Sequence, residues 1–413
     1  MNPLAQAADS LGCLTPAPGL LKQLMRQPLG ATPLRIRSGG NSSRCASDGC
    51  WTLDLRRHRE ILHHEATQEV EFGTGLTMAE LLQALRSSGR SLPIGLSGLT
   101  GSGFILSGGM GPLSRSQGLA LDHITAIQGI WGSGEPFALT QDQRGSDSNH
   151  WRALLGAAPF LAVVTSLRLR TQRLQTLQVR HGLIAESQLA ELIEIAESWP
   201  ETVSLQWNWG ERLEVYAVDC NPAESPSRHL EALDPFLGTD PRAAIRRCQD
   251  QLEQPRFGSL ASESVGSIPP HSEVIARLGP ALNHQAGPLI EHLSTRIRER
   301  PHNGCRISAQ QLGGATQRIS PGETSFIHRD SIWKPWITAA WNPGDQAGRE
   351  QSLAWMDQVS EDFRKVCPGV HLAQLHDHLP GHQKELEDAY GDWLPALRQL
   401  KAELDPEGRF PPL

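Results

Sequence analysis

Two hydrophobic patterns divide the chain. From about Leu34 to Leu169, short apolar runs such as WTLDL and LAVVTSLRLR alternate with glycine-rich turns. Short apolar runs between turns predict strands. After Thr171 the glycine turns become rarer, and longer stretches carry apolar residues at helical spacing, which predicts a second region with more helix. The predicted fold class is α+β.

One helix of the first region has clear signals at both ends. Thr77 precedes the segment MAELLQALR, and Glu80 follows Thr77 by three residues, so the two side chains can form a capping box. Apolar residues recur at helical spacing, and Gly89 can end the helix. We expect its apolar side to pack on a sheet.

The second region is predicted to combine helices and strands. Helices are expected at residues 187–199, 273–300 and 349–366, and strands at residues 204–210, 212–218, 305–314 and 325–341. A last helix within residues 391–410 is expected to stop at Asp405 and Pro406.

Size and charge exclude some classes of protein. The chain has 413 residues and a formal charge of −7, which is long enough for two lobes and argues against nucleic acid or a membrane surface as a partner. No stretch resembles a signal peptide or a membrane span, so we expect a cytoplasmic protein. The seven cysteines have no metal-binding spacing, which suits a reducing compartment, and no metal is predicted.

Three glycine-rich stretches carry the candidate chemistry. They are RSGGNSS at 37–43, GLSGLTGSGFILSGGMGPLSR at 95–115 and LLGAAPFLAVVTS at 154–166. Paired glycines let successive N–H groups converge on one anion, so two such loops suit a pyrophosphate. The alternative is that the glycines only mark tight hairpins, but seven glycines between Gly95 and Gly111 favour a ligand. The strand-turn-helix setting of a Rossmann fold or a P-loop is absent.

These residues resemble the FAD-linked oxidases of the vanillyl-alcohol oxidase superfamily, in the berberine-bridge-enzyme branch. The resemblance runs in order over nearly the whole chain, and GGMGPLSRSQGLALD, AVVTSLRLRT and the closing DPEGRF carry it most specifically. It implies FAD as cofactor and a PCMH-type FAD-binding lobe of two α+β subdomains, with an inserted substrate lobe of antiparallel sheet and helices. The implied division is 1–171 for the FAD-binding lobe, 172–378 for the substrate lobe, and 379–413 for a C-terminal segment that returns to the FAD-binding lobe.

The resemblance also implies which residues bind the cofactor. They are Arg37, Ser38, Gly39, Gly40, Asn41, Ser42, Ser97, Gly98, Leu99, Thr100, Gly101, Gly103, Gly108, Gly109, Gly111, Pro112, Leu113, Leu121, Val163 and Val164.

Two covalent tethers common in the family are missing. Many members bind the flavin through a histidine where this chain has Asn41, and through a cysteine near the place of Ser97, where serine or leucine stands here. Asparagine can only form hydrogen bonds, so we expect FAD held non-covalently, or a pocket that has drifted from flavin. In the third loop, Ala157, Ala158 and Pro159 replace family glycines and add bulk near the cofactor.

The family's usual tyrosine base is also missing. The stretch before the final helix, where that tyrosine lies, reads GVHLAQLHDHLPGHQ. A histidine with a pKa near ~6.5 could take the substrate proton instead; His376 is the first candidate and His371 the second. On an alternating strand His376 would share a face with His378, and His371 would lie on the other face. The alternative is a solvated histidine-rich loop.

Other side chains could contact a substrate. SFIHRD resembles a substrate-lobe strand, on which Arg329 could orient an anionic or carbonyl oxygen or could pair with Asp330 or Glu323. Aromatic residues on predicted strands could stack on a ring, although packing is their commoner use. These are Trp207, Trp209, Trp333, Trp336 and Trp341.

Two functions from different classes remain. The first is an FAD-dependent oxidoreductase that oxidises a small alcohol, hemiacetal or amine by hydride transfer and passes the electrons to oxygen or another acceptor. The second is a degenerate member that keeps the fold as a binding or structural protein with weak or no flavin. The glycine-rich loops favour the enzyme, because glycines cost backbone entropy on folding and a bound phosphate explains them.

Overall fold

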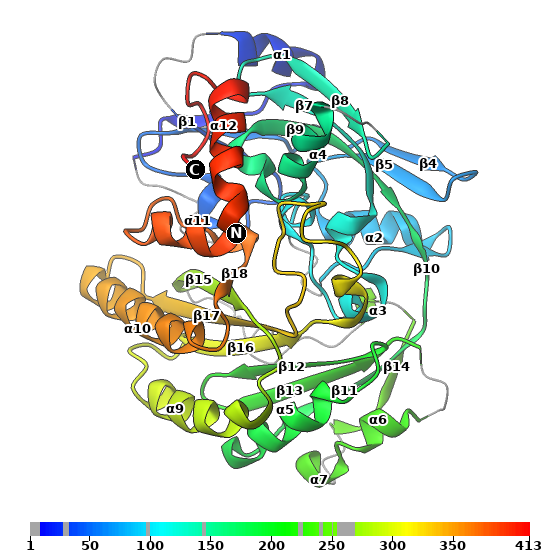
Figure 1. The fold of residues 1–413 in the computed structure, drawn as a ribbon, viewed down its shortest axis with the longest axis vertical. Coiled ribbons are helices and arrows are strands. Elements are labelled where there is room, and N and C mark those ends of the chain that lie inside the picture. The colour runs from blue at the N-terminus through cyan, green and yellow to red at the C-terminus, as the bar shows by residue number, and fades with distance from the viewer. Residues whose placement is uncertain are drawn as a thin grey trace.

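The computed structural model of the chain consists of two lobes, one above the other in Figure 1. It describes residues 9–27, 33–95, 100–142, 146–221, 226–238, 243–249, 251–253 and 269–413. Within these ranges no helix has both the length and the apolar character needed to cross a membrane.

The upper lobe contains two sheets. The first has three parallel strands in the order β1–β3–β2: β1 (Gly12–Leu14), β3 (Trp51–Asp54) and β2 (Leu34–Arg37). The second has five antiparallel strands in the order β4–β5–β9–β7–β8: β4 (Ile61–His64), β5 (Glu69–Gly73), β9 (Ala162–Arg170), β7 (Ile124–Trp131) and β8 (Pro136–Thr140). A short pair, β6 (Arg90–Ser91) and β10 (Gln172–Arg173), lies where the chain leaves this lobe.

Helix α2 (Met78–Arg86) forms as predicted. Thr77 Oγ1 accepts the Glu80 N–H at 3.4 Å, and Glu80 Oε2 accepts the Thr77 N–H at 2.9 Å, which is the capping box. The apolar side of the helix is buried in the core of the upper lobe. Gly89 follows the helix with a φ of 65°.

The last part of the chain packs on the upper lobe. Helix α12 (Leu394–Leu404) contributes Leu394, Leu397 and Leu404 to the same core as α2, and it lies beside the upper lobe in Figure 1. Asp405 ends this helix as predicted. The exact lobe boundaries given above stay predictions.

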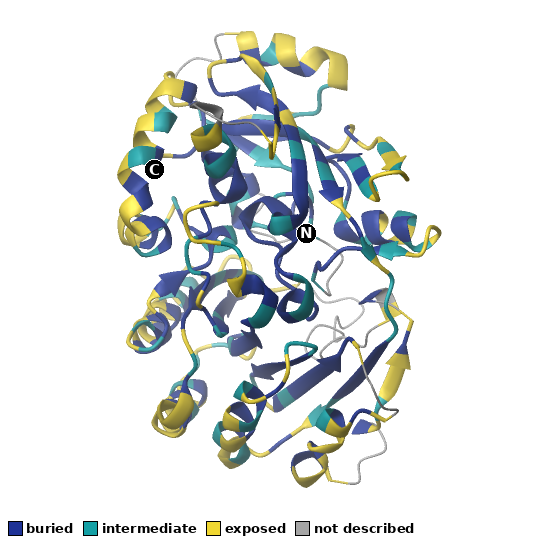
Figure 2. Ribbon diagram, turned by 45° about the vertical axis from the view of Figure 1, so that its right-hand side comes forward, coloured by how far each residue is buried: buried dark blue, intermediate teal, exposed yellow. Residues whose placement is uncertain are grey.

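The lower lobe is built on one eight-stranded sheet. Its order is β14 (Arg246–Cys248), β11 (Leu177–Leu183), β13 (Leu213–Asp219), β12 (Val203–Trp209), β16 (Arg306–Gln311), β17 (Trp333–Trp341), β15 (His271–Leu278) and β18 (Gly369–Val370). Helices α5 (Leu189–Glu197), α9 (Ala286–Arg298) and α10 (Gln346–Arg364) pack on one face and bury its apolar side chains. Figure 2 shows these strands buried along most of their length.

The opposite face of this sheet turns toward the upper lobe; it is apolar at β11 and β13, where Leu113 packs on it, and polar at β12 and β16. Gln310 Nε2 on β16 donates to Gly111 O at 2.7 Å, and Ser204 Oγ on β12 donates to Pro112 O at 3.0 Å. Side chains alternate between the two faces along β12 and β16, so the apolar ones pack against the helices and the polar ones face the second glycine loop.

Two predictions for this lobe are wrong, one over a whole segment and one over the first part of a strand. Residues 273–300 do not form one helix, since β15 ends at Leu278 and α9 begins at Ala286. Gly279 and Pro280 interrupt the segment, and the β-branched Val274 and Ile275 suit the strand that pairs with β17. The predicted strand at 325–341 begins only at Trp333, so SFIHRD is irregular backbone.

Candidate active site

The first glycine loop leaves strand β2 and turns sharply. Gly40 has a φ of 69°, a conformation that favours glycine. Beyond it, Ser42 Oγ accepts the Arg44 N–H at 3.2 Å and caps a short 3₁₀ helix, Ser43–Cys45. The loop therefore runs from a strand through a tight turn into a capped helical turn.

Ser38 fastens the first loop to the second. Its Oγ donates to Thr74 O at 2.6 Å and accepts the Ser102 N–H at 2.9 Å. The second loop is also held at the start of α2, where Met78 N–H donates to Thr100 O at 2.8 Å. The two loops are therefore held side by side by the strand and the helix that precede them.

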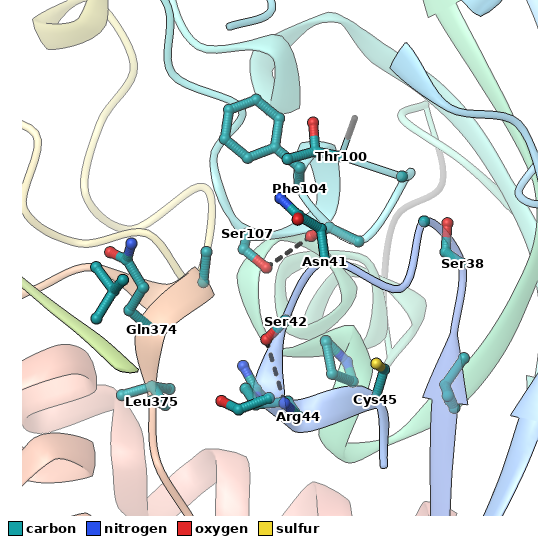
Figure 3. A pocket seen from close by; sticks show the side chains of 18 of the residues that line it. Ser38, Asn41, Ser42, Arg44, Cys45, Thr100, Phe104, Ser107, Gln374 and Leu375 are labelled. Carbon is teal, nitrogen blue, oxygen red and sulfur yellow. Dashed lines mark hydrogen bonds between the residues drawn. The ribbon is translucent and has the colours of Figure 1, made fainter. Parts of the chain in front are cut away.

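A cavity of about 340 Å³ lies between these loops and the lower lobe. Eight residues predicted to bind FAD line it: Ser38, Gly39, Gly40, Asn41, Ser42, Thr100, Gly101 and Gly103. The lower lobe contributes Glu273 and Val274 of β15, Lys334 of β17, and several residues between His371 and His376. Figure 3 shows Asn41 of the first loop and Gln374 of the lower lobe at this cavity.

The first loop fits a phosphate or another anionic part of a cofactor. Within the part of the chain that the structure describes, the N–H groups of Gly39, Gly40 and Asn41 donate to no other protein atom. Successive free amides around a left-handed residue form an anion-binding nest. Gly40 is the buried residue of the three, and a buried amide normally has a partner. A group such as FAD would supply the missing acceptors.

The other predicted FAD-binding residues lie elsewhere. Ser97, Gly98 and Leu99 fall outside the described residues. Arg37 pairs with Asp54 at 3.5 Å instead of lining the cavity. The remaining predicted residues do not line the cavity. They pack in the core of the upper lobe or between that lobe and the lower sheet: Gly108, Gly109, Gly111, Pro112, Leu113, Leu121, Val163 and Val164.

His376, the first candidate base, is held in a buried charged cluster. Its Nδ1–H donates to Glu385 Oε1 at 2.7 Å and its Nε2–H donates to Val274 O at 2.9 Å. Glu273 lies 3.4 Å from the same Nε2 and also pairs with His378 at 2.9 Å. Burial alone would lower the pKa of His376, but Glu385 and Glu273 outweigh it and raise that pKa to about 10.

This environment argues against His376 as the base. Both of its ring nitrogens carry a proton, so it cannot accept another. The expected alternating strand is also absent, because only Gly369–Val370 is a strand and a 3₁₀ helix follows at Leu372–Gln374. Within the described residues, no group of three or more histidine, cysteine, aspartate or glutamate side chains is arranged to hold a metal ion.

His371, the second candidate, has the opposite environment. It is 1 % exposed and lines the cavity. Neither ring nitrogen has a partner of good hydrogen-bond geometry among the described residues, and the side chain of Gln374 lies close enough to act weakly on its pKa. Its own N–H donates to Ala276 O at 3.0 Å, which fixes its backbone beside β15. Burial, with a contribution from nearby Lys334, holds the pKa of His371 well below its usual value. The imidazole is therefore neutral and free to accept a hydrogen bond.

Arg329 lies outside the cavity and is fully engaged. Its Nη1 lies 2.9 Å from Asp122 Oδ1, its Nη2 donates to Thr324 Oγ1 at 2.8 Å, and its Nε donates to Phe326 O at 3.0 Å. The predicted partners Asp330 and Glu323 were wrong, because Arg329 pairs with Asp122 in the second-loop region. Its position indicates that it joins the two lobes instead of orienting a substrate.

The aromatic residues divide between the two faces of the lower sheet. Four of them are in the core under the helices: Trp207, Trp209, Trp333 and Trp341. Trp336 alternates with Trp333 on β17 and lies on the polar face, where Lys334 Nζ sits 5.1 Å from its ring centre. Of the two tyrosines, Tyr390 is buried in the upper core and donates to Gly156 O at 3.3 Å.

The sequence analysis missed four charged residues of the cavity wall: Arg35, Arg44, Glu273 and Lys334. Arg44 directly follows the predicted loop, and this proximity was its only signal. Glu273 was assigned to a helix and Lys334 to an unremarkable strand. Their convergence depends on the pairing of β15 with β17, which residue spacing does not reveal.

Comparisons with known proteins agree with the fold and the cofactor. Residues 30–140 match the family model described as FAD binding domain. The FAD-linked oxidoreductase YgaK of Bacillus subtilis, itself uncharacterised, is 23 % identical over 92 % of this chain and 84 % of its own length. Aclacinomycin-N/aclacinomycin-A oxidase of Streptomyces galilaeus is 22 % identical over 82 % of this chain and 69 % of its own.

The solved structures show the same architecture. Berberine bridge enzyme from Eschscholzia californica superposes with a TM-score of 0.82 at 19 % identity, covering 100 % of this chain and 92 % of that one. The fold and the matched domain define a flavoprotein. The predicted resemblance to the FAD-linked oxidases is confirmed: the chain is an FAD-linked oxidoreductase, and FAD is its cofactor.

Proposed function

We propose that the protein holds FAD non-covalently and oxidises a small alcohol, hemiacetal or amine in the cavity between the lobes. One observation carries the proposal. His371, which is neutral, buried and without a hydrogen bond of good geometry among the described residues, lies in the wall of the same cavity as the free amides of the first loop. A proton acceptor and an anion-binding nest thus share one site.

The side chains at the cavity wall support non-covalent binding. Asn41 lines the cavity at the place of the family's histidine and has no nucleophilic atom for a flavin bond. Cys45 also lines it, but burial raises the pKa of its thiol. A protonated thiol is a poor nucleophile, so neither residue offers a tether.

His371 accepts the proton of the substrate hydroxyl or ammonium group in this proposal. Its free ring nitrogens can take that proton, whereas His376 already carries two. Ser38, Gly39, Gly40 and Asn41 would hold the cofactor through backbone and side-chain hydrogen bonds. FAD supplies the acceptor for the hydride that leaves the substrate carbon, and oxygen or another acceptor then takes the electrons.

The first loop and the matched domain favour a flavin-binding enzyme over a degenerate member with weak or no flavin. The three free amides of the first loop and the close contact between Gly39 and Gly101 have a purpose in a protein that binds a cofactor and none in one that has lost it. The matched FAD binding domain also covers both of these loops.

Anaerobic mixing tests the proposal. The FAD-loaded protein is mixed without oxygen with panels of small alcohols, reducing sugars and primary amines, and the visible flavin absorbance is followed. We expect at least one panel to bleach the flavin with a saturable rate, and the colour to return when oxygen or an artificial acceptor is admitted. Loaded protein that no member of any panel bleaches would count against the proposal.

A further inference from the structure

Lys334 is a buried cation without a counter-ion. It is 8 % exposed and lines the cavity. Among the residues that the structure describes, no carboxylate lies within 4.0 Å of its Nζ. The ring of Trp336, whose centre is 5.1 Å from Nζ, forms a cation–π contact with it. Lysine is rarely buried in proteins unless it is paired, so this position calls for an anion that the chain itself does not provide.

The carboxylate of the cavity wall is already in use. Glu273 Oε1 accepts from Ser43 Oγ at 2.9 Å, and its Oε2 pairs with His378 at 2.9 Å. Burial alone lowers the pKa of Lys334 to about 8, with no contribution from Glu273. The carboxylate of Glu273 is therefore engaged by Ser43 and the histidines and not by the lysine.

A second cation of the wall has the same character. Arg44 Nη1 donates to Leu372 O at 3.1 Å, and its guanidinium lies 4.9 Å from the ring centre of Phe160. Within the described chain no carboxylate lies within 4.0 Å of Arg44 either. The other arginine of the wall, Arg35, forms a salt bridge with Asp377. Lys334 and Arg44 are therefore two cations of the cavity wall that have no carboxylate within 4.0 Å among the described residues.

We propose that Lys334 binds a carboxylate of the substrate, so that the preferred substrates are hydroxy, sugar or amino compounds that carry an acid group. The inference rests on the proposed function and names the substrate class of the same site. A carboxylate on Lys334 would place the rest of the substrate beside His371, the neutral neighbour of that lysine. The anion would supply the missing counter-ion and form a charge-assisted hydrogen bond.

Binding of benzoate and of uncharged benzamide to the FAD-loaded protein tests the inference. Both affinities are measured by thermal shift in wild type, in Lys334→Met and in Lys22→Met, whose lysine is exposed on α1 (Pro18–Arg26). We expect benzoate to bind wild type and Lys22→Met equally, and to bind Lys334→Met about 10- to 100-fold more weakly, the usual effect of losing a charge-assisted bond. Benzamide should bind all three proteins alike. Equal benzoate binding by wild type and Lys334→Met would overturn the proposal.

The pH dependence gives a second reading that does not need a variant. The other charged and titratable groups of the same wall are His371, His376, Glu273, Arg44, Arg35 and Cys45. Only Lys334 among the cations of this wall has a pKa of about 8. Benzoate affinity should therefore stay constant from about pH 6 to that pH, and fall above it by about 10- to 100-fold, as expected for Lys334→Met. Affinity that is unchanged to pH 10 would assign binding to an arginine and contradict the proposal.

The anion could also be part of FAD itself, and the FAD-free protein separates the two sources. If Lys334 faces the substrate, benzoate shifts the melting temperature of the loaded protein. If it faces FAD, benzoate shifts only the FAD-free protein, and Lys334→Met retains less FAD; this result overturns the inference. Flavin bleached by neutral alcohols but not by their acid counterparts would refute the inference and leave the proposed function standing. Benzoate binding through Lys334 without bleaching by any panel would refute the proposed function and leave Lys334 as a carboxylate-binding residue.

Discussion

Gly39 and Gly101 face each other so closely that neither could carry a side chain. A Cβ on Gly39 would lie less than 3.0 Å from the backbone nitrogen of Gly101, and a Cβ on Gly101 would overlap the nitrogen of Gly39 and Ser38 Oγ. Apart from Ser38 Oγ, the neighbouring atoms are backbone, which cannot move aside cheaply. The two loops that line the cavity are therefore in direct contact, and glycine is required by space at both positions.

Gly101→Ala should separate the two loops. We expect a loss of about 1–3 kcal/mol in the free energy of unfolding, the usual cost of overpacking, and a lower FAD content because the nest at Gly40 shifts. Urea unfolding and the flavin-to-protein absorbance ratio measure both effects. Gly287→Ala is the matched control, since a Cβ there meets nothing within 4 Å. Gly101→Ala protein with full FAD and unchanged stability would show that the contact does not hold the loops.

Asn41→His should be able to restore a covalent bond to the flavin. Asn41 lines the cavity at the place where the family's histidine tether stands, so an imidazole there would lie in the right loop. After acid precipitation, we expect part of the yellow colour to stay with the pellet in Asn41→His and none in Asn41→Gln. Full release of flavin from both variants would mean that position 41 does not approach the flavin ring.

His371→Gln should slow the reduction of the flavin without removing it. Loss of a general base typically costs about 10²- to 10⁴-fold in rate, whereas glutamine keeps a polar side chain of similar length. The anaerobic bleaching rate and the FAD content are measured together, with His284→Gln as the exposed control. An unchanged rate in His371→Gln would remove this residue from the mechanism.

His376→Gln should instead lower stability. The variant leaves Glu385 and Glu273 without their shared cation, and breaking a buried ion pair in this way costs about 3–5 kcal/mol. We expect a large drop in the urea midpoint, against a small one for His284→Gln. A stable variant with a strongly reduced bleaching rate would return His376 to the role of catalytic base.

The same cluster gives the stability a dependence on pH at both ends. His376⁺ outweighs the effect of burial and lowers the pKa of Glu385 to about 2, so the stabilisation is present above the ordinary pKa of 4.5 and is lost as the pH falls toward 2. The raised pKa of His376, about 10, means that its contribution is complete below pH 6.5 and is lost as the pH rises toward 10. Unfolding free energies measured across this range in wild type should fall at both ends, and His376→Gln should flatten both.

The sequence predicted those parts of the fold that depend on neighbouring residues. The capping box at Thr77 and Glu80 marked the start of α2, and Asp405 marked the end of α12. The prediction of one helix at 273–300 failed because a short strand, a Gly-Pro break and a helix together keep apolar residues at helical spacing. The first part of this segment is extended because it pairs, as β15, with β17, and β17 lies outside the segment.

Part of the cavity wall consists of residues that the sequence indicated. Local chemistry was sufficient for the first loop, because Gly39, Gly40 and Asn41 act through backbone conformation. The roles of His371 and His376 could not be predicted from their spacing, since Glu273 and Glu385 reach only one of them. Lys334 gave one weak signal, its alternation with Trp333 on a strand otherwise apolar and aromatic, which places a charge on the face away from the core.

The most direct test of the account is the visible absorption spectrum of the purified protein before and after acid precipitation. We predict a flavin band in the native protein that passes completely into the supernatant, because Asn41 and the protonated thiol of Cys45 offer no covalent bond. Yellow colour retained in the pellet would contradict non-covalent binding, and Cys45→Ser would then identify or exclude that thiol as the tether. A colourless protein that takes up no added FAD would contradict the account at its centre.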